Sequence, residues 1–190
     1  MRLACIIQAR LGSTRFPGKV LAKLGGKPVL DWVVEAAARI PRVNEVRVAW
    51  PGPHEHEDDV LSRYWRVAGE LGWPDAIMRV TGDCPLLDPH VSSLVVEKFL
   101  GGGAMYVSNI WPVRTWPDGL DTEVFTLEAL RRAHEGARDL HDREHVTPWM
   151  QRNLVCLNVP HMVDWSRVRL TLDTPEDLRW LEQVLASPRS

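Results

Sequence analysis

The sequence predicts an α/β fold in which helices cover both faces of a mostly parallel central sheet. Short segments of strand length, apolar or alternating, recur along the chain, and stretches with apolar residues at helical spacing separate them. Such strand-helix-strand units place successive strands parallel and join them by right-handed crossovers. With 190 residues and 45% hydrophobic content, the chain is long enough for one sizeable core. We therefore expect a single domain over residues 1–190.

The individual elements follow from these periodicities and from the signals at their ends. Strands are predicted over residues 3–7, 45–50, 76–80, 105–109, 155–159 and 168–172. Helices are predicted from residue 30 up to Pro41, over residues 60–71, from Pro89 to Gly101, after Thr126, over residues 143–152 and from Thr174 onward. Asp88, Thr126 and Thr174 are the expected N-caps, because short polar side chains accept hydrogen bonds from the first free N–H groups of a helix. Residues 110–119 contain two Trp-Pro pairs and are predicted to form a loop that leads into residues 121–125.

Composition narrows the classes of function. The formal net charge is −2 and the charges of both signs are interspersed, so no broad basic surface for nucleic acid is expected. The first apolar run is too short for a signal peptide and no later run reaches membrane-spanning length, which predicts a cytoplasmic protein without a membrane partner. Cys5, Cys84 and Cys156 lie far apart with neither disulfide nor zinc spacing, and they are expected to be small buried apolar side chains.

The segment Ala9-Arg-Leu-Gly-Ser-Thr-Arg-Phe-Pro-Gly-Lys19 follows the first predicted strand directly. Its glycines, serine and proline allow tight turns that point backbone N–H groups inward, and its three cations suit phosphate oxygens. A solvated basic turn is the plain alternative, but open α/β sheets bind ligands at this edge. The Walker pattern is absent because Val20 follows Gly18-Lys19. We therefore predict a polyphosphate-binding loop.

The segment Ile7-Gln-Ala-Arg-Leu-Gly-Ser-Thr-Arg-Phe-Pro-Gly-Lys-Val20, followed by Gly25-Gly-Lys-Pro-Val-Leu30, resembles the opening of the cytidylyltransferases that make CMP-activated acidic sugars, and is most similar to the spore-coat polysaccharide biosynthesis branch. The resemblance implies a three-layer nucleotide-diphospho-sugar-transferase-like (Rossmann-like) fold. It also implies transfer of CMP from CTP to an acidic or modified sugar, with release of pyrophosphate, in the biosynthesis of a surface polysaccharide. Mg²⁺ would be the cofactor, and a homodimer is possible. The nucleotide-binding residues would be Ala9, Arg10, Gly12, Ser13, Arg15 and Lys19, of which Arg10, Arg15 and Lys19 would also be catalytic.

Two aspartates at predicted strand ends are candidate magnesium ligands, since Mg²⁺ is held by one or two carboxylates plus substrate phosphates. Asp83 lies in Arg79-Val-Thr-Gly-Asp-Cys-Pro-Leu-Leu-Asp88, where an Asx turn is an equal alternative. Asp173 ends the predicted strand 168–172, where a capping acid is the alternative. The family carries its metal aspartate in the first motif, and closes the metal site with the segment intact here as residues 172–178. The resemblance thus makes Asp83 catalytic, and both Asp83 and Asp173 metal ligands.

A further acidic motif, Asp118-Gly-Leu-Asp-Thr-Glu-Val-Phe125, concentrates three carboxylates. It reads equally well as a solvated turn, but the resemblance assigns Asp118, Asp121 and Glu123 to the sugar side. The motif at residues 143–148 also matches the family. It overlaps His141-Asp-Arg-Glu-His145, which fits the His-x-x-Glu-His pattern of inverted zinc peptidases. Pro148 shortens the helix that would carry the two histidines, which argues against a zinc site. His54 and His56, among the acids of residues 55–58, are expected in a solvated loop.

The chain departs from the family between Trp50 and Asp58, where the family normally inserts a helix and a strand beside the base pocket. This omission keeps open a second function from another class: a shortened, inactive relative that binds nucleotide or a partner protein. A glycosyltransferase using a nucleotide sugar is a third possibility, although its usual Asp-x-Asp motif is absent.

Overall fold

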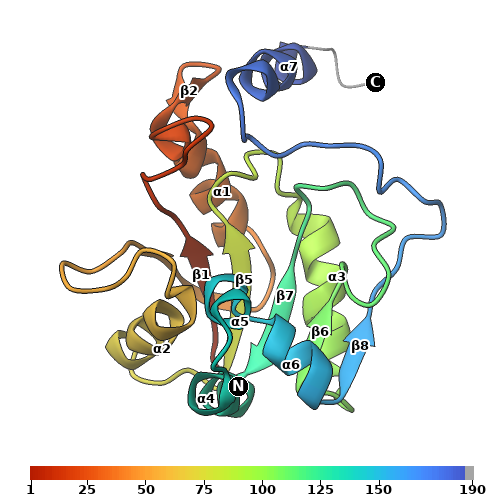
Figure 1. Ribbon diagram of the computed structural model, residues 1–190. Coiled ribbons are helices and arrows are strands. Elements are labelled where there is room, and N and C mark those ends of the chain that lie inside the picture. Colours follow the sequence, from red (N-terminus) through yellow and green to blue (C-terminus); the bar gives the residue numbers. More distant parts are fainter. Residues whose placement is uncertain (187–190) are drawn as a thin grey trace.

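A six-stranded sheet forms the centre of the computed structural model, which describes residues 1–186 (Figure 1). Its strands are β1 (Leu3–Gln8), β4 (Val43–Ala49), β5 (Ala76–Thr81), β6 (Tyr106–Ser108), β7 (Glu123–Thr126) and β8 (Cys156–Asn158). They lie in the order β4-β1-β5-β7-β6-β8. Only β7 runs against the others, pairing antiparallel with both β5 and β6. The predicted α/β class with a mostly parallel sheet is confirmed.

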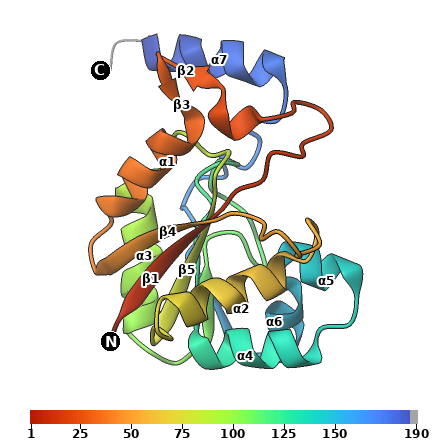
Figure 2. The same cartoon turned by 90° about the vertical axis from the view of Figure 1, so that its left-hand side faces the viewer.

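Helices cover both faces of this sheet. Helices α1 (Val29–Ala38) and α3 (Pro89–Leu100) lie on one face, and α2 (Val60–Glu70), α4 (Leu127–Gly136), α5 (Leu140–His145) and α6 (Pro148–Asn153) on the other (Figure 2). Successive strand residues point to opposite faces, so Ile7 packs in the α1/α3 core with Val33, while Ile6 packs in the α2/α4 core with Tyr64. The three layers follow from this alternation.

The predicted start signals of two helices form as expected. The Asp88 carboxylate accepts from the His90 N–H at 2.7 Å, and Pro89 takes the first position of α3. The Thr126 hydroxyl accepts from the Ala129 N–H at 3.0 Å at the start of α4. These caps depend only on neighbours along the chain, which is why the sequence reveals them.

Two predicted elements are wrong. Residues 143–152 do not form one helix, because Val146 adopts a φ of 70° after α5 and Pro148 begins α6 as a separate helix. Residues 168–172 do not form a strand. They cross the ends of the sheet strands and keep a single isolated bridge, Asp118 to Arg169, with hydrogen bonds from Asp118 N to Val168 O (2.9 Å) and Leu170 N to Asp118 O (2.7 Å).

The carboxyl ends of the parallel strands carry a small additional layer. It contains the hairpin of β2 (Lys23–Leu24) and β3 (Lys27–Pro28) and the last helix, α7 (Pro175–Ala186) (Figure 1). A separate apolar cluster joins them: Leu24, Val29, Leu172 and Leu181 are buried at its centre. None of the helices in residues 1–186 combines the length and apolar character that crossing a bilayer requires.

Candidate functional site

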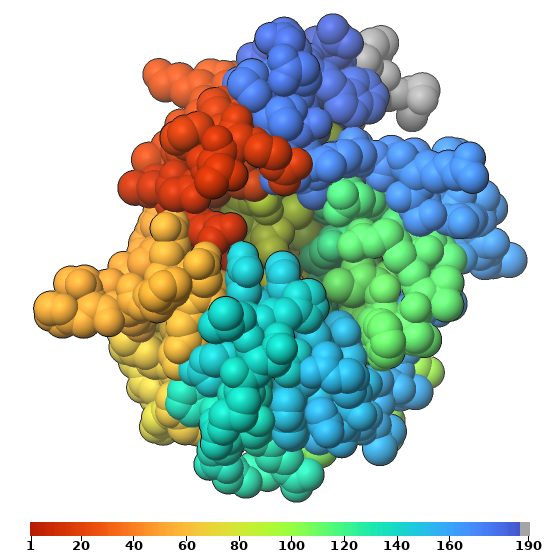
Figure 3. All heavy atoms as spheres, in the orientation of Figure 1, coloured from red at the N-terminus to blue at the C-terminus, as the bar shows by residue number. Residues whose placement is uncertain are grey.

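The predicted phosphate loop leaves the end of β1 and borders a cavity of about 360 Å³. Gly18, at a φ of 70°, closes the loop with a hydrogen bond from its N–H to the Leu11 carbonyl at 2.9 Å. Ala9 is buried at its start, and the Ser13 hydroxyl accepts weakly from the Phe16 N–H at 3.4 Å. In the space-filling view, this red loop lies beside a hollow that also borders α5 and the segment before α7 (Figure 3). The cavity walls include Arg10, Gly12, Ser13, Thr14, Arg15 and Lys19.

Lys19 joins the two predicted metal ligands. Its Nζ lies 2.5 Å from Asp83 Oδ2 and 2.6 Å from Asp173 Oδ1, so both carboxylates converge on one cation position. The backbone ties the same two segments together, since the Leu172 N–H donates to the Asp83 carbonyl at 2.8 Å. A second cavity of about 190 Å³ adjoins this point and shares Arg10, Lys19 and Asp173 with the first. Lys19 therefore meets Asp83, which is 64 positions away in the chain, and Asp173, which is 154 positions away.

Positive charge surrounds Asp173. Arg15 Nη2 lies 3.2 Å from its Oδ2, Arg169 donates to the same oxygen, and Lys19 binds the other one. Burial alone would raise the pKa of Asp173, but Lys19, Arg169 and Arg15 outweigh burial and hold that pKa below its usual value. Burial would lower the pKa of Lys19, yet Asp83 and Asp173 raise it. Lys19 and Asp173 are therefore both charged near neutral pH.

The donor set at this point fits Mg²⁺. Asp83 and Asp173 offer hard carboxylate oxygens that already converge on the Lys19 ammonium, and Mg²⁺ is usually held by one or two carboxylates with the rest from phosphates and water. Across residues 1–186, no group of three or more His, Cys, Asp or Glu side chains is arranged to hold a metal by itself. A divalent cation at these two aspartates would thus depend on further oxygens from a ligand.

The acidic motif at residues 118–125 separates into two parts. Asp121 is bound by both Nη atoms of Arg114, at 2.5 and 2.7 Å, and Asp118 lies 3.7 Å from the same guanidinium. Burial and then Asp121 raise the pKa of Asp118. Glu123, by contrast, is 1% exposed: it pairs with Arg79 and accepts from the Tyr106 hydroxyl (2.6 Å) and the Thr147 hydroxyl (2.7 Å). Asp118 and Asp121 are half-buried and line neither of the two cavities beside Lys19, and Glu123 is turned inward.

Two side chains of the short turn of residues 51–59, which the sequence predicts to be solvated, contact the loop of residues 9–19. Asp58 Oδ1 accepts from Arg10 Nη1 at 2.8 Å, and Glu57 Oε1 accepts from the Gly12 N–H at 3.1 Å. Both line the larger cavity. His54 and His56 are exposed, as predicted. The acidic residues immediately before Asp59 could have indicated these contacts, because the cations and free N–H groups of the loop can bind any carboxylate that reaches them.

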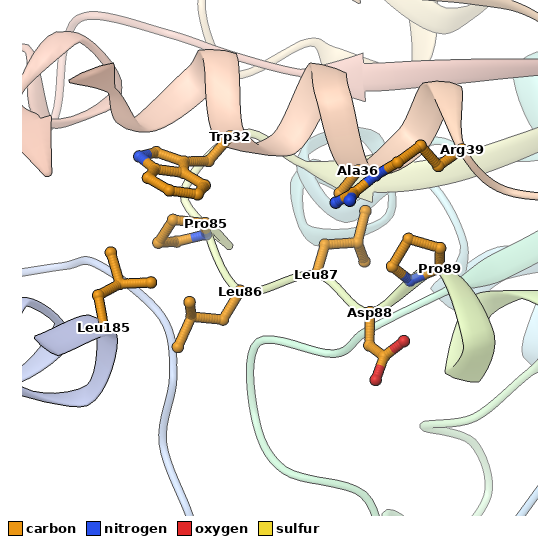
Figure 4. A pocket seen from close by; sticks show the side chains of 9 residues that line it. All are labelled: Trp32, Ala36, Arg39, Pro85, Leu86, Leu87, Asp88, Pro89 and Leu185. Atoms are coloured by element: carbon orange, nitrogen blue, oxygen red, sulfur yellow. The ribbon is translucent and has the colours of Figure 1, made fainter. Parts of the chain in front are cut away.

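The opposite side of the Asp83 loop borders another cavity, of about 330 Å³ (Figure 4). Trp32 of α1 and Arg39, which directly follows α1, lie across it from Pro85, Leu86 and Pro89, with Leu185 of α7 at one end. The Asp88 carboxylate already caps α3. This cavity lies between the loop and α1 and shares no lining residue with the two cavities of the cationic site.

Comparisons with known proteins agree with this geometry. The family model described as cytidylyltransferase matches residues 4–51, which contain β1, the loop of residues 9–19 and α1. Uncharacterized protein MJ1063 of Methanocaldococcus jannaschii is 32% identical, covering 94% of this chain and 81% of that protein. That alignment extends over 202 positions, more than this whole chain, so the relative contains residues with no counterpart here.

Two other relatives have descriptive names. The spore coat polysaccharide biosynthesis protein SpsF of Bacillus subtilis is 28% identical over 90% of this chain and 81% of that protein. A 3-deoxy-manno-octulosonate cytidylyltransferase of Trichlorobacter lovleyi is 35% identical, but the alignment covers 58% of this chain and 50% of that protein.

Solved structures share the whole fold. CMP:2-keto-3-deoxy-manno-octonic acid synthetase, solved in complex with CTP, matches with a TM-score of 0.74 over 98% of this chain and 99% of that chain; at 17% identity this likeness shows the fold alone. A cytidylyltransferase from Leptospira borgpetersenii matches with a TM-score of 0.91 and 30% identity, covering 100% of this chain and 89% of that chain. Identity and coverage together show that this chain belongs to the cytidylyltransferase family.

Proposed function

We propose that this protein transfers CMP from CTP to an acidic or modified sugar and releases pyrophosphate, for the synthesis of a surface polysaccharide. One observation carries the proposal: Arg10, Arg15 and Lys19 of one loop lie around the same connected cavities as Asp83 and Asp173. That combination suits a triphosphate with a divalent cation. The names of the relatives, a sugar-acid cytidylyltransferase and a polysaccharide biosynthesis protein, support the class of acceptor.

In this proposal the chain positions charge and reactants. Arg10, Arg15 and Lys19 bind the triphosphate and stabilise the negative charge that collects on the departing pyrophosphate. Asp83 and Asp173 would hold Mg²⁺, which supplies further neutralisation of the phosphates when bound. A sugar hydroxyl oxygen bonds to the α-phosphorus while the bond to the bridging oxygen of the β-phosphate breaks. Asp118, whose pKa is raised by burial and by Asp121, would accept the hydroxyl proton.

Nucleotide-induced stabilisation tests the binding part of this proposal. A melting scan with CTP and Mg²⁺ at about a hundred times the dissociation constant should raise the Tm of the wild type by roughly 5–10 °C. Arg15→Ala should lose most of that shift, because a guanidinium bound to phosphate is removed. Arg179→Ala is the matched control: Arg15 and Arg179 are 62% and 66% exposed and both pair with an acid, but Arg179 lies on the outside of α7. Equal shifts in all three proteins would contradict the site.

Release of pyrophosphate from CTP with a panel of sugar acids tests the chemistry. Asp83→Asn should remove turnover without unfolding the protein. Asp88→Asn in the same loop should retain turnover, because Asp88 caps α3 and asparagine is an equally good N-cap. Undiminished turnover by Asp83→Asn would refute the metal assignment.

The inactive relative is the second candidate, and the structure holds one observation in its favour. Glu57 and Asp58 occupy donors of the phosphate loop, Gly12 N–H and Arg10, that a nucleotide needs. Two outcomes would support this second function: folded protein that binds no nucleotide, or CTP binding with no pyrophosphate release from any sugar acid.

A further inference from the structure

The two carboxylate oxygens of Asp173 are engaged by different cations. Oδ1 accepts from Lys19 Nζ at 2.6 Å, whereas Oδ2 accepts from Arg169 and lies 3.2 Å from Arg15 Nη2. Lys19 and Arg15 line the larger cavity, where the proposed function draws both of them to phosphate oxygens. Arg169 lines neither of the two cavities beside Lys19. In the proposed function, Arg169 is therefore the cation that stays on Asp173 when a nucleotide binds.

Arg169 is held both at its backbone and at its guanidinium. Its carbonyl accepts from the Trp180 indole N–H at 3.1 Å. Its Nη2 lies 3.8 Å from Asp177 Oδ2, and the same oxygen accepts from the N–H groups of Asp173 (2.9 Å) and Thr174 (2.8 Å). Asp177 thus anchors the guanidinium and also the backbone of the aspartate with which that guanidinium pairs. The Arg169 side chain is 42% exposed, so solvent screens part of its charge.

The choice between Mg²⁺ and Ca²⁺ depends on how many oxygens each carboxylate offers. Mg²⁺ is small and demands near-octahedral geometry, whereas Ca²⁺ takes a larger and less regular set of oxygens, which can include both oxygens of one carboxylate. A cation that chelated both oxygens of Asp173 would share Oδ2 with the Arg169 guanidinium and would be repelled by its charge. With Oδ2 engaged, Asp173 offers Oδ1 alone. A single oxygen suits Mg²⁺ better than Ca²⁺.

We propose that Arg169 makes Asp173 a one-oxygen ligand and thereby favours Mg²⁺ over Ca²⁺ at the nucleotide site. Arg169 is a positioning residue, because it acts through Asp173 and touches neither the nucleotide nor the cation. This role rests on the proposed function, since a cation at Asp83 and Asp173 needs further oxygens from the phosphates of a nucleotide.

The test measures the dissociation constant of CTP by calorimetry, in excess Mg²⁺ and in excess Ca²⁺, on folded wild type, Arg169→Met and Arg169→Lys. The wild type should bind CTP more tightly with Mg²⁺. Arg169→Met should lower this Mg²⁺-over-Ca²⁺ preference roughly three- to tenfold, because both oxygens of Asp173 become available to Ca²⁺. Arg169→Lys should restore part of the preference, since an ammonium can occupy Oδ2 as a point charge. Arg179→Met is the matched control: it removes an exposed arginine of α7 that pairs with Glu176, so it should leave the preference unchanged.

The ratio of the two dissociation constants separates this role from a merely structural one. Weaker CTP binding by Arg169→Met to the same degree with both cations would mean that Arg169 only holds residues 168–173 in place, and would overturn the inference. An unchanged preference in Arg169→Met, or a wild type that binds CTP equally with either cation, would overturn it as well. All three results include CTP binding and leave the proposed function standing. Failure of CTP to bind the wild type with either cation would overturn the proposed function, and the role of Arg169 with it.

Discussion

Glu57 and Asp58 place negative charge where the phosphates of a nucleotide would bind. Arg10 and the Gly12 N–H, both donors of the phosphate loop, are engaged by these two carboxylates. In the proposed function an incoming triphosphate would have to displace them, so the carboxylates would compete with the ligand for the same donors. The competition is partial, because Asp58 is 53% exposed and its ion pair with Arg10 is screened by solvent.

Neutralising these carboxylates should therefore tighten nucleotide binding. For the double variant Glu57→Gln with Asp58→Asn, we expect the affinity for CTP to increase roughly three- to tenfold, with a smaller gain at high ionic strength. Calorimetry at two salt concentrations measures both effects. Glu70→Gln is a suitable control, since Glu70 is an exposed acid on α2 that pairs with Arg66 away from the loop. Weaker binding by the double variant would show that the carboxylates help to hold the ligand or its cation.

At the scale of elements, the sequence reveals what depends on neighbours along the chain. The capped starts of α3 and α4 and the loop carrying Lys19 could all be predicted from short motifs. The burial of Glu123 could not, because it depends on Arg79, 44 positions away. The same holds for residues 168–172, whose alternating pattern is typical of a strand but whose neighbour is the 117–120 loop rather than the sheet edge. Long-range pairing decides both cases.

The bridge between Asp118 and Arg169 requires glycine at position 119. Gly119 has a φ of 109°, and a Cβ there would lie 2.8 Å from the Leu170 carbonyl carbon and 3.0 Å from its oxygen. Gly119→Ala should therefore lower the free energy of unfolding by roughly 2–4 kcal/mol, through backbone strain and displacement of residues 168–173. Urea unfolding measures the loss. CTP affinity should fall as well, because the displaced segment carries Asp173.

Gly102→Ala is the matched control for this prediction. Gly102 also has a positive φ, 78°, but a Cβ there meets no atom within 4 Å. Only the conformational strain remains, about 1–2 kcal/mol, with CTP affinity unchanged. Equal effects of the two substitutions would mean that close contact with Leu170 contributes nothing.

At the scale of the whole molecule, one small apolar cluster connects three segments of the site. Phe16 comes from the phosphate loop, Leu86 from the loop after Asp83, and Leu172 directly precedes Asp173. Leu181 of α7, fully buried, packs in the same cluster. The last helix of the chain therefore supports the geometry of a site that it does not line.

Leu181→Ala should consequently weaken nucleotide binding in protein that is still folded. Loss of the buried side chain costs about 2–4 kcal/mol of stability, and the cavity left behind frees the three segments to shift relative to one another. Leu130→Ala is the control, because Leu130 of α4 is equally buried but lies in the cluster against α2, away from the site. Urea unfolding should give comparable losses for the two variants, whereas calorimetry at low temperature should show reduced CTP affinity only for Leu181→Ala. If both variants bound CTP as the wild type does, the three segments would be held by their own hydrogen bonds and ion pairs, without help from α7.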